Sequence, residues 1–124
     1  MAKLSSLMSD SKKVNGGVWV DYTDGVRLLI ARKPNDNYDA AMVKALQPYR
    51  GAIRAGTFTD AMDQKVSLEV ISKTVLIGWN NIEDEESNPI EYSPEKALEL
   101  LTDPDIRRFV LITCMDRDRY RKTE

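Results

Sequence analysis

The 124-residue chain contains no histidine and only one cysteine. Histidine is the commonest general base and a frequent metal ligand, so its absence removes the usual catalytic triads and most transition-metal sites. The single thiol, Cys114, lies in an apolar run without a histidine to activate it, and we expect it to be a small buried side chain. The sequence therefore predicts a protein that is not an enzyme and that uses no metal and no cofactor.

Neither sign of charge dominates, because 18 basic side chains face 20 acidic ones. Such a balance provides no general field for attracting nucleic acid. No stretch approaches the ~20 apolar residues of a membrane span, and the Ser- and Lys-rich start lacks the apolar region of a signal peptide. We expect a single-domain protein of the cytoplasm that binds neither nucleic acid nor membranes.

An acidic run, Glu83 to Glu86, is the densest cluster of charge. It could chelate a hard cation, but it lacks the alternating Asp-x-Asp-x-Asp-Gly pattern and the distal glutamate of a calcium loop. A solvated acidic loop is the favoured interpretation. An alternative is an electrostatic contact with a neighbouring subunit. The cations that could take part are Arg117, Arg119, Arg121 and Lys122.

The first 33 residues divide into two segments. Residues 1–17 are polar and lack periodicity, so they predict a flexible N-terminal arm. Residues 18–33 predict a β-hairpin, because apolar residues alternate on either side of a Thr23-Asp24-Gly25 turn. The alternating residues are Val18, Val20 and Tyr22, then Val26, Leu28 and Ile30. An isolated hairpin is marginal in water, so it must pack on something.

Several residues are typical of helix starts. Asp39 offers an N-cap for a short helix ending near Pro48, and Thr59 or Asp60 caps a longer one that runs to Trp79, with Gly78 as its terminator. Ser93 and Asp103, each followed by proline and an acid, begin two further helices. The expected fold is mainly α (α+β): an N-terminal β-hairpin packed on a small bundle of four or so helices, forming one domain over residues 18–122.

Two of these helices are apolar on two sides. In the helix from residue 60, one face carries Leu68, Ile71, Val75 and Trp79, and the nearly opposite face carries Met62, Val66, Val70 and Ile77. A helix of this kind is either enclosed in the core or uses one side for a partner. In the last helix, one side carries Ile106, Phe109, Val110, Thr113 and Tyr120, and Leu111 and Met115 lie on the second side. The sequence leaves open which face is the core.

The two tryptophans allow opposite interpretations. Trp79 favours a core position, although a partner-facing site is the alternative, because tryptophan is enriched at the energetic centres of interfaces. Trp19 falls on the wetter face of the hairpin and is an interface candidate. The candidates for partner binding or self-association are Trp19, Met62, Val66, Val70, Ile77, Trp79, Leu111, Met115, Arg117 and Arg121.

One segment of the chain resembles a known family. Its features are Leu76-Ile77-Gly78-Trp79, the acidic loop, Ile90-Glu91-Tyr92-Ser93-Pro94-Glu95, Ala97-Leu98-Glu99-Leu100-Leu101 and Asp103-Pro104. This order is similar to that of the tail assembly chaperones of long, non-contractile-tailed bacteriophages. The similarity is most specific over residues 76–105. The chain departs from the family at Ser87-Asn88-Pro89, where relatives often carry a glycine.

The resemblance implies a protein without catalytic activity. Such a protein binds the tape measure protein, recruits tail tube subunits, associates with itself and is absent from the mature virion; its location would be the host cytoplasm. Two other functions stay open: a tail or neck component that remains in the virion, and a small host-directed regulatory protein.

Overall fold

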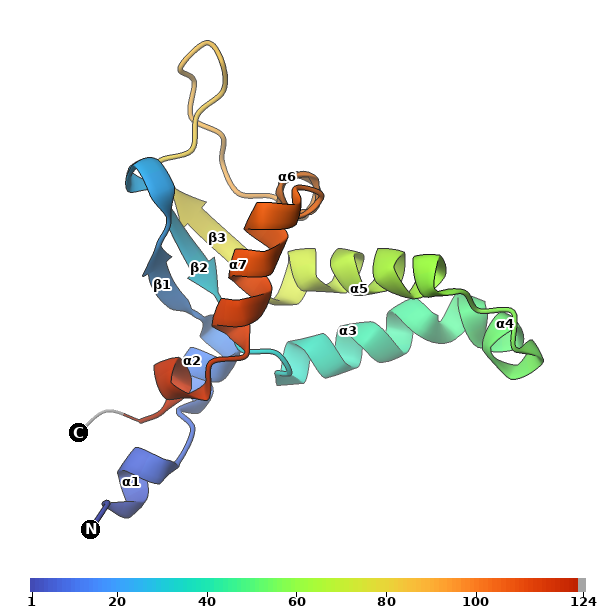
Figure 1. The fold of residues 1–124 in the computed structure, drawn as a ribbon, viewed down its shortest axis with the longest axis horizontal. Coiled ribbons are helices and arrows are strands. Elements are labelled where there is room, and N and C mark those ends of the chain that lie inside the picture. Colours follow the sequence, from blue (N-terminus) through green and yellow to red (C-terminus); the bar gives the residue numbers. More distant parts are fainter. Residues whose placement is uncertain (123–124) are drawn as a thin grey trace.

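The computed structural model describes residues 1–122 and combines seven helices with a three-stranded antiparallel sheet of order β1-β2-β3 (Figure 1). The mainly helical α+β class predicted from the sequence is confirmed. The strands are β1 (Val18–Asp21), β2 (Arg27–Ile30) and β3 (Leu76–Asn80). The helices are α1 (Leu4–Leu7), α2 (Ser11–Gly16), α3 (Asp36–Leu46), α4 (Arg50–Ala55), α5 (Asp60–Thr74), α6 (Pro94–Leu101) and α7 (Pro104–Cys114). Three-residue and four-residue 3-10 turns span Thr23–Gly25, Gln47–Tyr49 and Arg117–Tyr120.

The predicted β-hairpin is present and pairs as its alternation requires. Val20 lies opposite Leu28, and both are buried against the helices. Asp24 and Gly25 both have positive φ, at 57° and 78°, which is the conformation that makes Asp-Gly a frequent turn pair. The turn therefore sets the register, and the register places one face of the hairpin in the core.

The third strand was not predicted. The sequence predicted a helix running to Trp79, but the helix ends at Thr74 and Leu76–Asn80 pairs antiparallel with β2. The run from Val75 to Ile77 is apolar and suits a strand as well as a helix, and pairing satisfies backbone groups that β2 would otherwise leave open. Gly78 is thus not a helix terminator. It lies opposite Leu29, where an added Cβ would stand 3.3 Å from the Leu29 Cβ atom.

The predicted helix caps are largely confirmed. Thr59, Ser93 and Asp103 each accept a hydrogen bond from a backbone N–H of the first turn of the helix that follows. The exception is α3, which begins at Asp36 rather than near Asp39. Its cap is Asn35, whose Oδ1 accepts from the Tyr38 N–H while its Nδ2 donates to the Arg32 and Thr74 carbonyls. Asn35 is buried, so it also fixes α3 to the end of α5.

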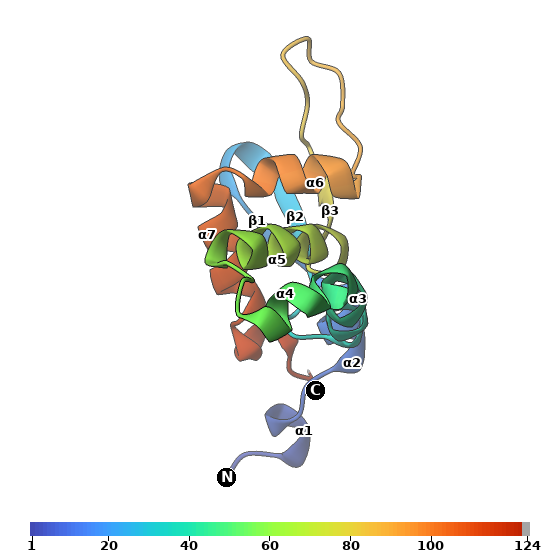
Figure 2. The same ribbon diagram turned by 90° about the vertical axis from the view of Figure 1, so that its right-hand side faces the viewer.

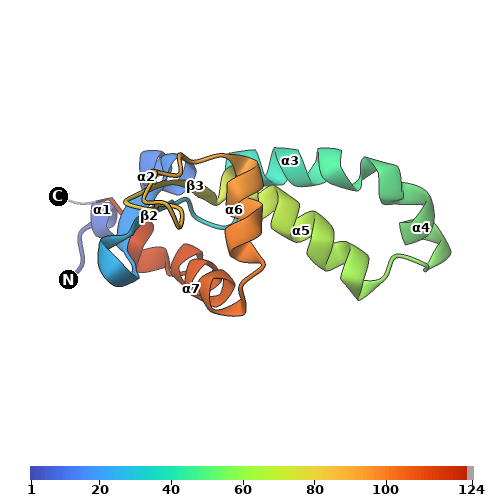
Figure 3. The same cartoon turned by 90° about the horizontal axis from the view of Figure 1, so that it is seen from above.

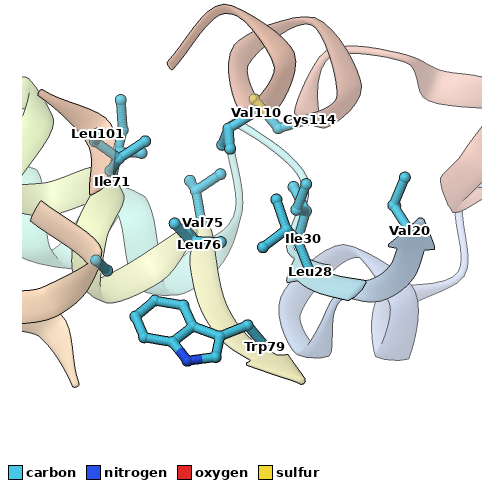
Figure 4. Packing of buried hydrophobic residues seen from close by; sticks show 11 residues of the cluster. Val20, Leu28, Ile30, Ile71, Val75, Leu76, Trp79, Leu101, Val110 and Cys114 are labelled. Atoms are coloured by element: carbon cyan, nitrogen blue, oxygen red, sulfur yellow. The ribbon is translucent and has the colours of Figure 1, made fainter. Parts of the chain in front are cut away.

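The core lies between one face of the sheet and the helices α5, α6 and α7 (Figure 4). Its members come from every one of these elements. They are Val20, Leu28, Ile30, Ile71, Val75, Leu76, Trp79, Ala97, Leu101, Val110 and Cys114. Burial of this apolar surface is the main favourable contribution to folding. Within residues 1–122, no helix combines the length and the apolar character needed to cross a membrane.

Helices α3 and α4 and the first turns of α5 form a helical hairpin that extends away from this core (Figures 1 and 3). No residue from Asp36 to Lys65 is buried. The tip is closed by an edge-to-face contact of Tyr49 with Phe58, whose ring centroids are 5.6 Å apart. Apolar side chains exposed along it are Val43, Ile53 and Met62.

Residues 8–14, inside the predicted N-terminal arm, are hydrogen-bonded to the domain. The Asp10 N–H donates to the Tyr120 carbonyl at 2.7 Å, and the Lys122 N–H donates to the Met8 carbonyl at 2.9 Å. The Arg32 N–H donates to the Val14 carbonyl at 3.0 Å. The sequence indicated neither these bonds nor the helix α2. Flexibility of residues 1–17 stays a prediction.

Tyr120 fixes the C-terminal segment to the sheet. The sequence placed it on the last helix, but that helix ends at Cys114 and Tyr120 belongs to a separate 3-10 turn. Its ring is fully buried and its hydroxyl donates to the Ile30 carbonyl at 3.0 Å. The side chain therefore joins residues that are 90 positions apart in the chain.

Replacing Tyr120 by phenylalanine should lower the free energy of unfolding by about 1–2 kcal/mol, because the buried Ile30 carbonyl loses its partner. Chemical denaturation followed by circular dichroism measures the change. Tyr49→Phe, at the tip of the helical hairpin, is the matched control and should change stability by less than about 0.5 kcal/mol. Equal effects of the two substitutions would contradict a structural role for the Tyr120 hydroxyl.

Candidate functional site

The segment that carries the family resemblance forms one continuous unit: β3, a projecting loop and α6. We call residues 81–91 the acidic loop; it extends beyond the body of the molecule next to α6 (Figures 1 and 2). Its two sides are joined by hydrogen bonds from the Ile90 N–H to the Ile82 carbonyl at 2.8 Å and from the Asp84 N–H to the Asn88 carbonyl at 2.9 Å. The loop is therefore an ordered, hairpin-like projection.

Asp84 organises the tip of this loop. Its Oδ1 accepts from the backbone N–H groups of Glu86 and Asn88, each at 2.9 Å. Ser87 takes the left-handed conformation, with φ of 66°, which glycine adopts more readily than other residues. The Asp84 carboxylate thus has a local structural role, while the glutamates around it are exposed to solvent.

Trp79 anchors the base of the loop. Its side chain is buried, and its indole Nε1–H donates to the Ile90 carbonyl at 2.8 Å. Its ring meets the Tyr92 ring edge to face at 5.1 Å, and the Tyr92 hydroxyl donates to the Ser72 carbonyl at 2.6 Å. Burial, and then the charge of Glu95, raise the pKa of Tyr92. The core interpretation of Trp79 is confirmed, because these contacts fix the start of the loop to its end.

A largely apolar depression lies at the base of the acidic loop, between the loop, the β1–β2 turn and the helices α6 and α7. It consists of three neighbouring cavities of about 310, 470 and 190 Å³ that share Ile82 as a lining residue. We call it the loop-base cleft. Its apolar lining is formed mainly by Tyr22, Val26, Trp79, Ile82, Ile90, Leu100 and Ile106.

The rim of the loop-base cleft is acidic. The ionisable residues that line it are Asp24, Glu83, Glu91, Glu99, Asp103 and Lys96. The one lysine is paired with Glu99 at 3.3 Å, so its charge is largely offset by a rim acid. An apolar floor with an acidic rim is complementary to a segment whose apolar side chains are flanked by lysine or arginine.

The structure separates the predicted partner-binding residues into two groups. Val66, Val70 and Trp79 are buried, which corrects their assignment as surface candidates. Because α5 packs on α3, α6 and β3, both of its apolar faces are covered in its C-terminal half. Trp79, in β3, belongs to the core cluster. Met62 and Trp19 are exposed, at 39% and 42% of their full surface. The Trp19 ring lies 5.6 Å from the Arg27 guanidinium.

The remaining candidates lie on other parts of the surface. Ile77 is half-buried at the irregular point of the β2–β3 pairing. Leu111 and Met115 line a shallow cavity of about 340 Å³ on α7 together with Ile112 and two arginines, Arg107 and Arg108. Among the predicted residues, only this pair is brought together.

The predicted C-terminal cations are engaged locally. Arg121 is 3.1 Å from Asp118, and Arg119 is 3.4 Å from Asp116; Arg117 is exposed. Their segment lies at the opposite end of the molecule from the acidic loop (Figure 1). A contact between them would require a neighbouring subunit, and it stays a prediction. Among the described residues, no three Cys, Asp or Glu side chains converge as metal ligands.

Cys114 is fully buried, and its thiol donates to the Leu111 carbonyl at 3.2 Å. Burial raises its pKa from 9.0 to about 11, against the smaller opposing effect of Lys33. The fraction of thiolate at pH 8 is therefore ~100-fold lower than for an exposed thiol of ordinary pKa.

Native protein at pH 8 should react with a disulfide reagent at least ~100-fold more slowly than protein in denaturant. Because the raised pKa favours the neutral thiol in the folded state, the stabilisation is complete below about pH 9 and is lost as the pH rises through about 11. Thiol titration and unfolding at pH 8 and 10.5 check both points. Cys114→Ala should reduce the pH dependence, and a thiol that reacts rapidly in native protein would contradict the assignment.

Sequence reasoning missed the loop-base cleft. The available signal was the pair Ile82 and Ile90, two large apolar residues at either end of a strongly polar run. Leu100 and Ile106 complete the floor from α6 and α7, and their convergence depends on the packing angle of two helices, which no local pattern in the sequence specifies.

In a comparison with protein families, a family model described as YdaY prophage protein matches residues 33–124. The matched region includes α3 to α7, β3, the acidic loop and most of the loop-base cleft. It leaves out the first 32 residues, with α1, α2 and the β1–β2 hairpin. No curated protein and no solved structure matches the chain.

Proposed function

The chain belongs to the YdaY prophage protein family, and from that premise we propose that it is a tail assembly chaperone of a long, non-contractile-tailed bacteriophage. It acts without catalysis in the host cytoplasm, binding the tape measure protein and tail tube subunits during tail assembly. It also associates with itself and leaves before the virion is complete.

The observation that carries this proposal is a set of apolar surfaces left open on a well-packed domain. The helical hairpin exposes Val43, Ile53 and Met62, and α7 exposes Ile112 and Met115. Apolar side chains exposed on helices are suited to covering the apolar faces of a helical client.

The segment that resembles tail assembly chaperones supports the same function. Its Gly-Trp pair, acidic loop and Ser-Pro-Glu helix start form one unit around the loop-base cleft. Trp79 and Ser93 act structurally in that unit, since one packs in the core and the other caps α6. A structural role for the motif residues suits a binding protein better than an enzyme.

Co-expression with the tape measure protein of the same prophage tests the proposal. The soluble fraction of that client should rise several-fold with the wild-type chain. The double substitution Val43→Glu/Ile53→Glu should abolish most of the gain, because it places charge on the exposed apolar surface of the helical hairpin. Asn37→Glu/Gln47→Glu is the matched control: it adds the same charge to the same hairpin at exposed polar positions and should leave the gain intact.

An unchanged soluble fraction of the client would refute the chaperone function. Mass spectrometry of purified virions provides an independent test, because an assembly chaperone should be absent from them. Stoichiometric recovery of the chain in virions would instead favour a tail or neck component. Retention on DNA at ~0.2 M salt would favour a regulatory protein.

A further inference from the structure

We propose that chains associate head to tail, with the segment around α1 of one chain bound in the loop-base cleft of a second copy. This inference specifies the two surfaces used for the self-association included in the proposed function, and it rests on that part of it. The first surface, residues 1–8, lies outside the region matched by the family model.

The segment around α1 presents apolar side chains that the rest of the described chain, residues 9–122, leaves largely exposed. Leu4, Leu7 and Met8 expose 73%, 58% and 44% of their surface, and no residue of α1 is buried. The residues that follow, 9–13, carry Lys12 and Lys13 against one acidic residue, Asp10. The segment is thus apolar with a basic flank.

The loop-base cleft has the complementary character. Its floor is apolar, with Ile82, Ile90, Leu100 and Ile106 partly exposed within it. Its rim carries five acidic residues and one lysine. Apolar side chains flanked by cations would therefore find both contact area and opposite charge there.

The geometry excludes the same contact within one chain. The acidic loop and α1 lie at opposite ends of the molecule in two perpendicular views (Figures 1 and 2). Residues 8–10 are hydrogen-bonded to the C-terminal segment through the Met8 and Asp10 backbone groups, which hold the base of α1 at the end of the molecule opposite the acidic loop. Two complementary surfaces at opposite ends form a heterologous contact, which continues into open chains unless the rotation closes a ring.

Sedimentation velocity of the full chain over micromolar to hundreds-of-micromolar concentrations tests the association. Wild-type protein should form dimers and longer species as the concentration rises, since a contact made through one short segment is weak. Leu4→Glu/Leu7→Glu should remain monomeric. Glu83→Lys/Glu91→Lys, which reverses charge on the cleft, should weaken association at least about fivefold. Its matched control, Glu85→Lys/Glu86→Lys, reverses the same charge at the loop tip outside the cleft and should have less than half that effect.

Mixing the two defective variants gives the sharpest result. The charge-reversed protein still offers its α1 segment, and the Leu4→Glu/Leu7→Glu protein still offers its cleft. At a concentration at which each variant alone is monomeric, their mixture should therefore form dimers and nothing longer. Wild-type protein at the same total concentration should form species larger than dimers. Chains longer than dimers in the mixture, or association that survives Leu4→Glu/Leu7→Glu, would overturn the proposal.

Trp79 lines the cleft and provides a direct probe of its occupancy. In a Trp19→Phe background, a synthetic peptide of residues 1–13 should change the Trp79 fluorescence in a saturable, salt-weakened manner. The same peptide with glutamate at positions 4 and 7 should not. A cleft that binds neither this peptide nor a second copy, but retains an apolar basic segment of the tape measure protein, would overturn self-association through α1.

These outcomes are separable from those of the proposed function. Client solubility measured with Leu4→Glu/Leu7→Glu reports on chaperone activity without this contact. Loss of association with normal client solubility refutes the inference alone, whereas association without any effect on the client refutes the chaperone function alone.

Discussion

Replacing Trp79 by alanine should lower the free energy of unfolding by about 3–5 kcal/mol. The substitution removes a buried ring that packs in the core cluster and meets Tyr92 edge to face. It also leaves the Ile90 carbonyl without the indole N–H that it accepts at 2.8 Å. Because the free energy of unfolding of a domain is about 5–15 kcal/mol, a loss of this size removes much of the stability of the protein.

Two variants separate the contributions to this effect. Trp79→Phe retains an aromatic ring but loses the hydrogen bond, and should cost about 1–2 kcal/mol. Trp19→Ala makes the same change as Trp79→Ala at an exposed position, where the ring contacts the Arg27 guanidinium, and should cost less than about 1 kcal/mol. Denaturation followed by circular dichroism measures all three. Similar losses for Trp19→Ala and Trp79→Ala would show that Trp79 does not anchor the loop.

The elements that could be predicted from the sequence are those specified by local chemistry. Ser93 and Asp103 were assigned as helix caps because a short oxygen-bearing side chain before a proline satisfies the first backbone donors of a helix. Asp24 and Gly25 were assigned as a turn because both tolerate positive φ. The structure contains both caps and the turn with the expected hydrogen bonds and dihedral angles.

The strand Leu76–Asn80 could not be predicted in the same way. Its residues have no local feature that separates a strand from the last turns of a helix, and its conformation is decided by pairing with β2, nearly 50 residues earlier. Gly78 illustrates the ambiguity: glycine near the end of an apolar run suits a helix terminator, but here it makes room for Leu29 across the sheet.

The candidate site shows a related limit. The helical pattern identified two apolar faces on α5, but which of them meets solvent depends on what else packs there. In the structure, α5 packs on α3, α6 and β3, and Val66 and Val70 are buried, whereas Met62 stays exposed. The face of α5 that carries Met62, Val66 and Val70 is thus part of the core at one end and exposed surface at the other.

Replacing Val70 by aspartate should unfold much of the protein, with a loss of about 4–5 kcal/mol or more. Val70 is 2% exposed, and α5 packs on α3, α6 and β3; a carboxylate there would be desolvated without a designed partner. Soluble yield and denaturation measure the loss. Met62→Asp, two turns earlier on the same face of α5, should change stability by less than about 1 kcal/mol.

The pair of variants decides between the two interpretations of α5 that the sequence left open. If Val70 belonged to a surface for partners, Val70→Asp would fold normally and lose only client binding, as expected for an exposed residue. If Val70 belongs to the core, Met62→Asp is the variant that folds normally, and its soluble protein can then be tested for client binding. Because Met62 lies on the projecting helical hairpin with Val43 and Ile53, reduced client solubility with Met62→Asp would place the binding surface on that hairpin rather than on α7.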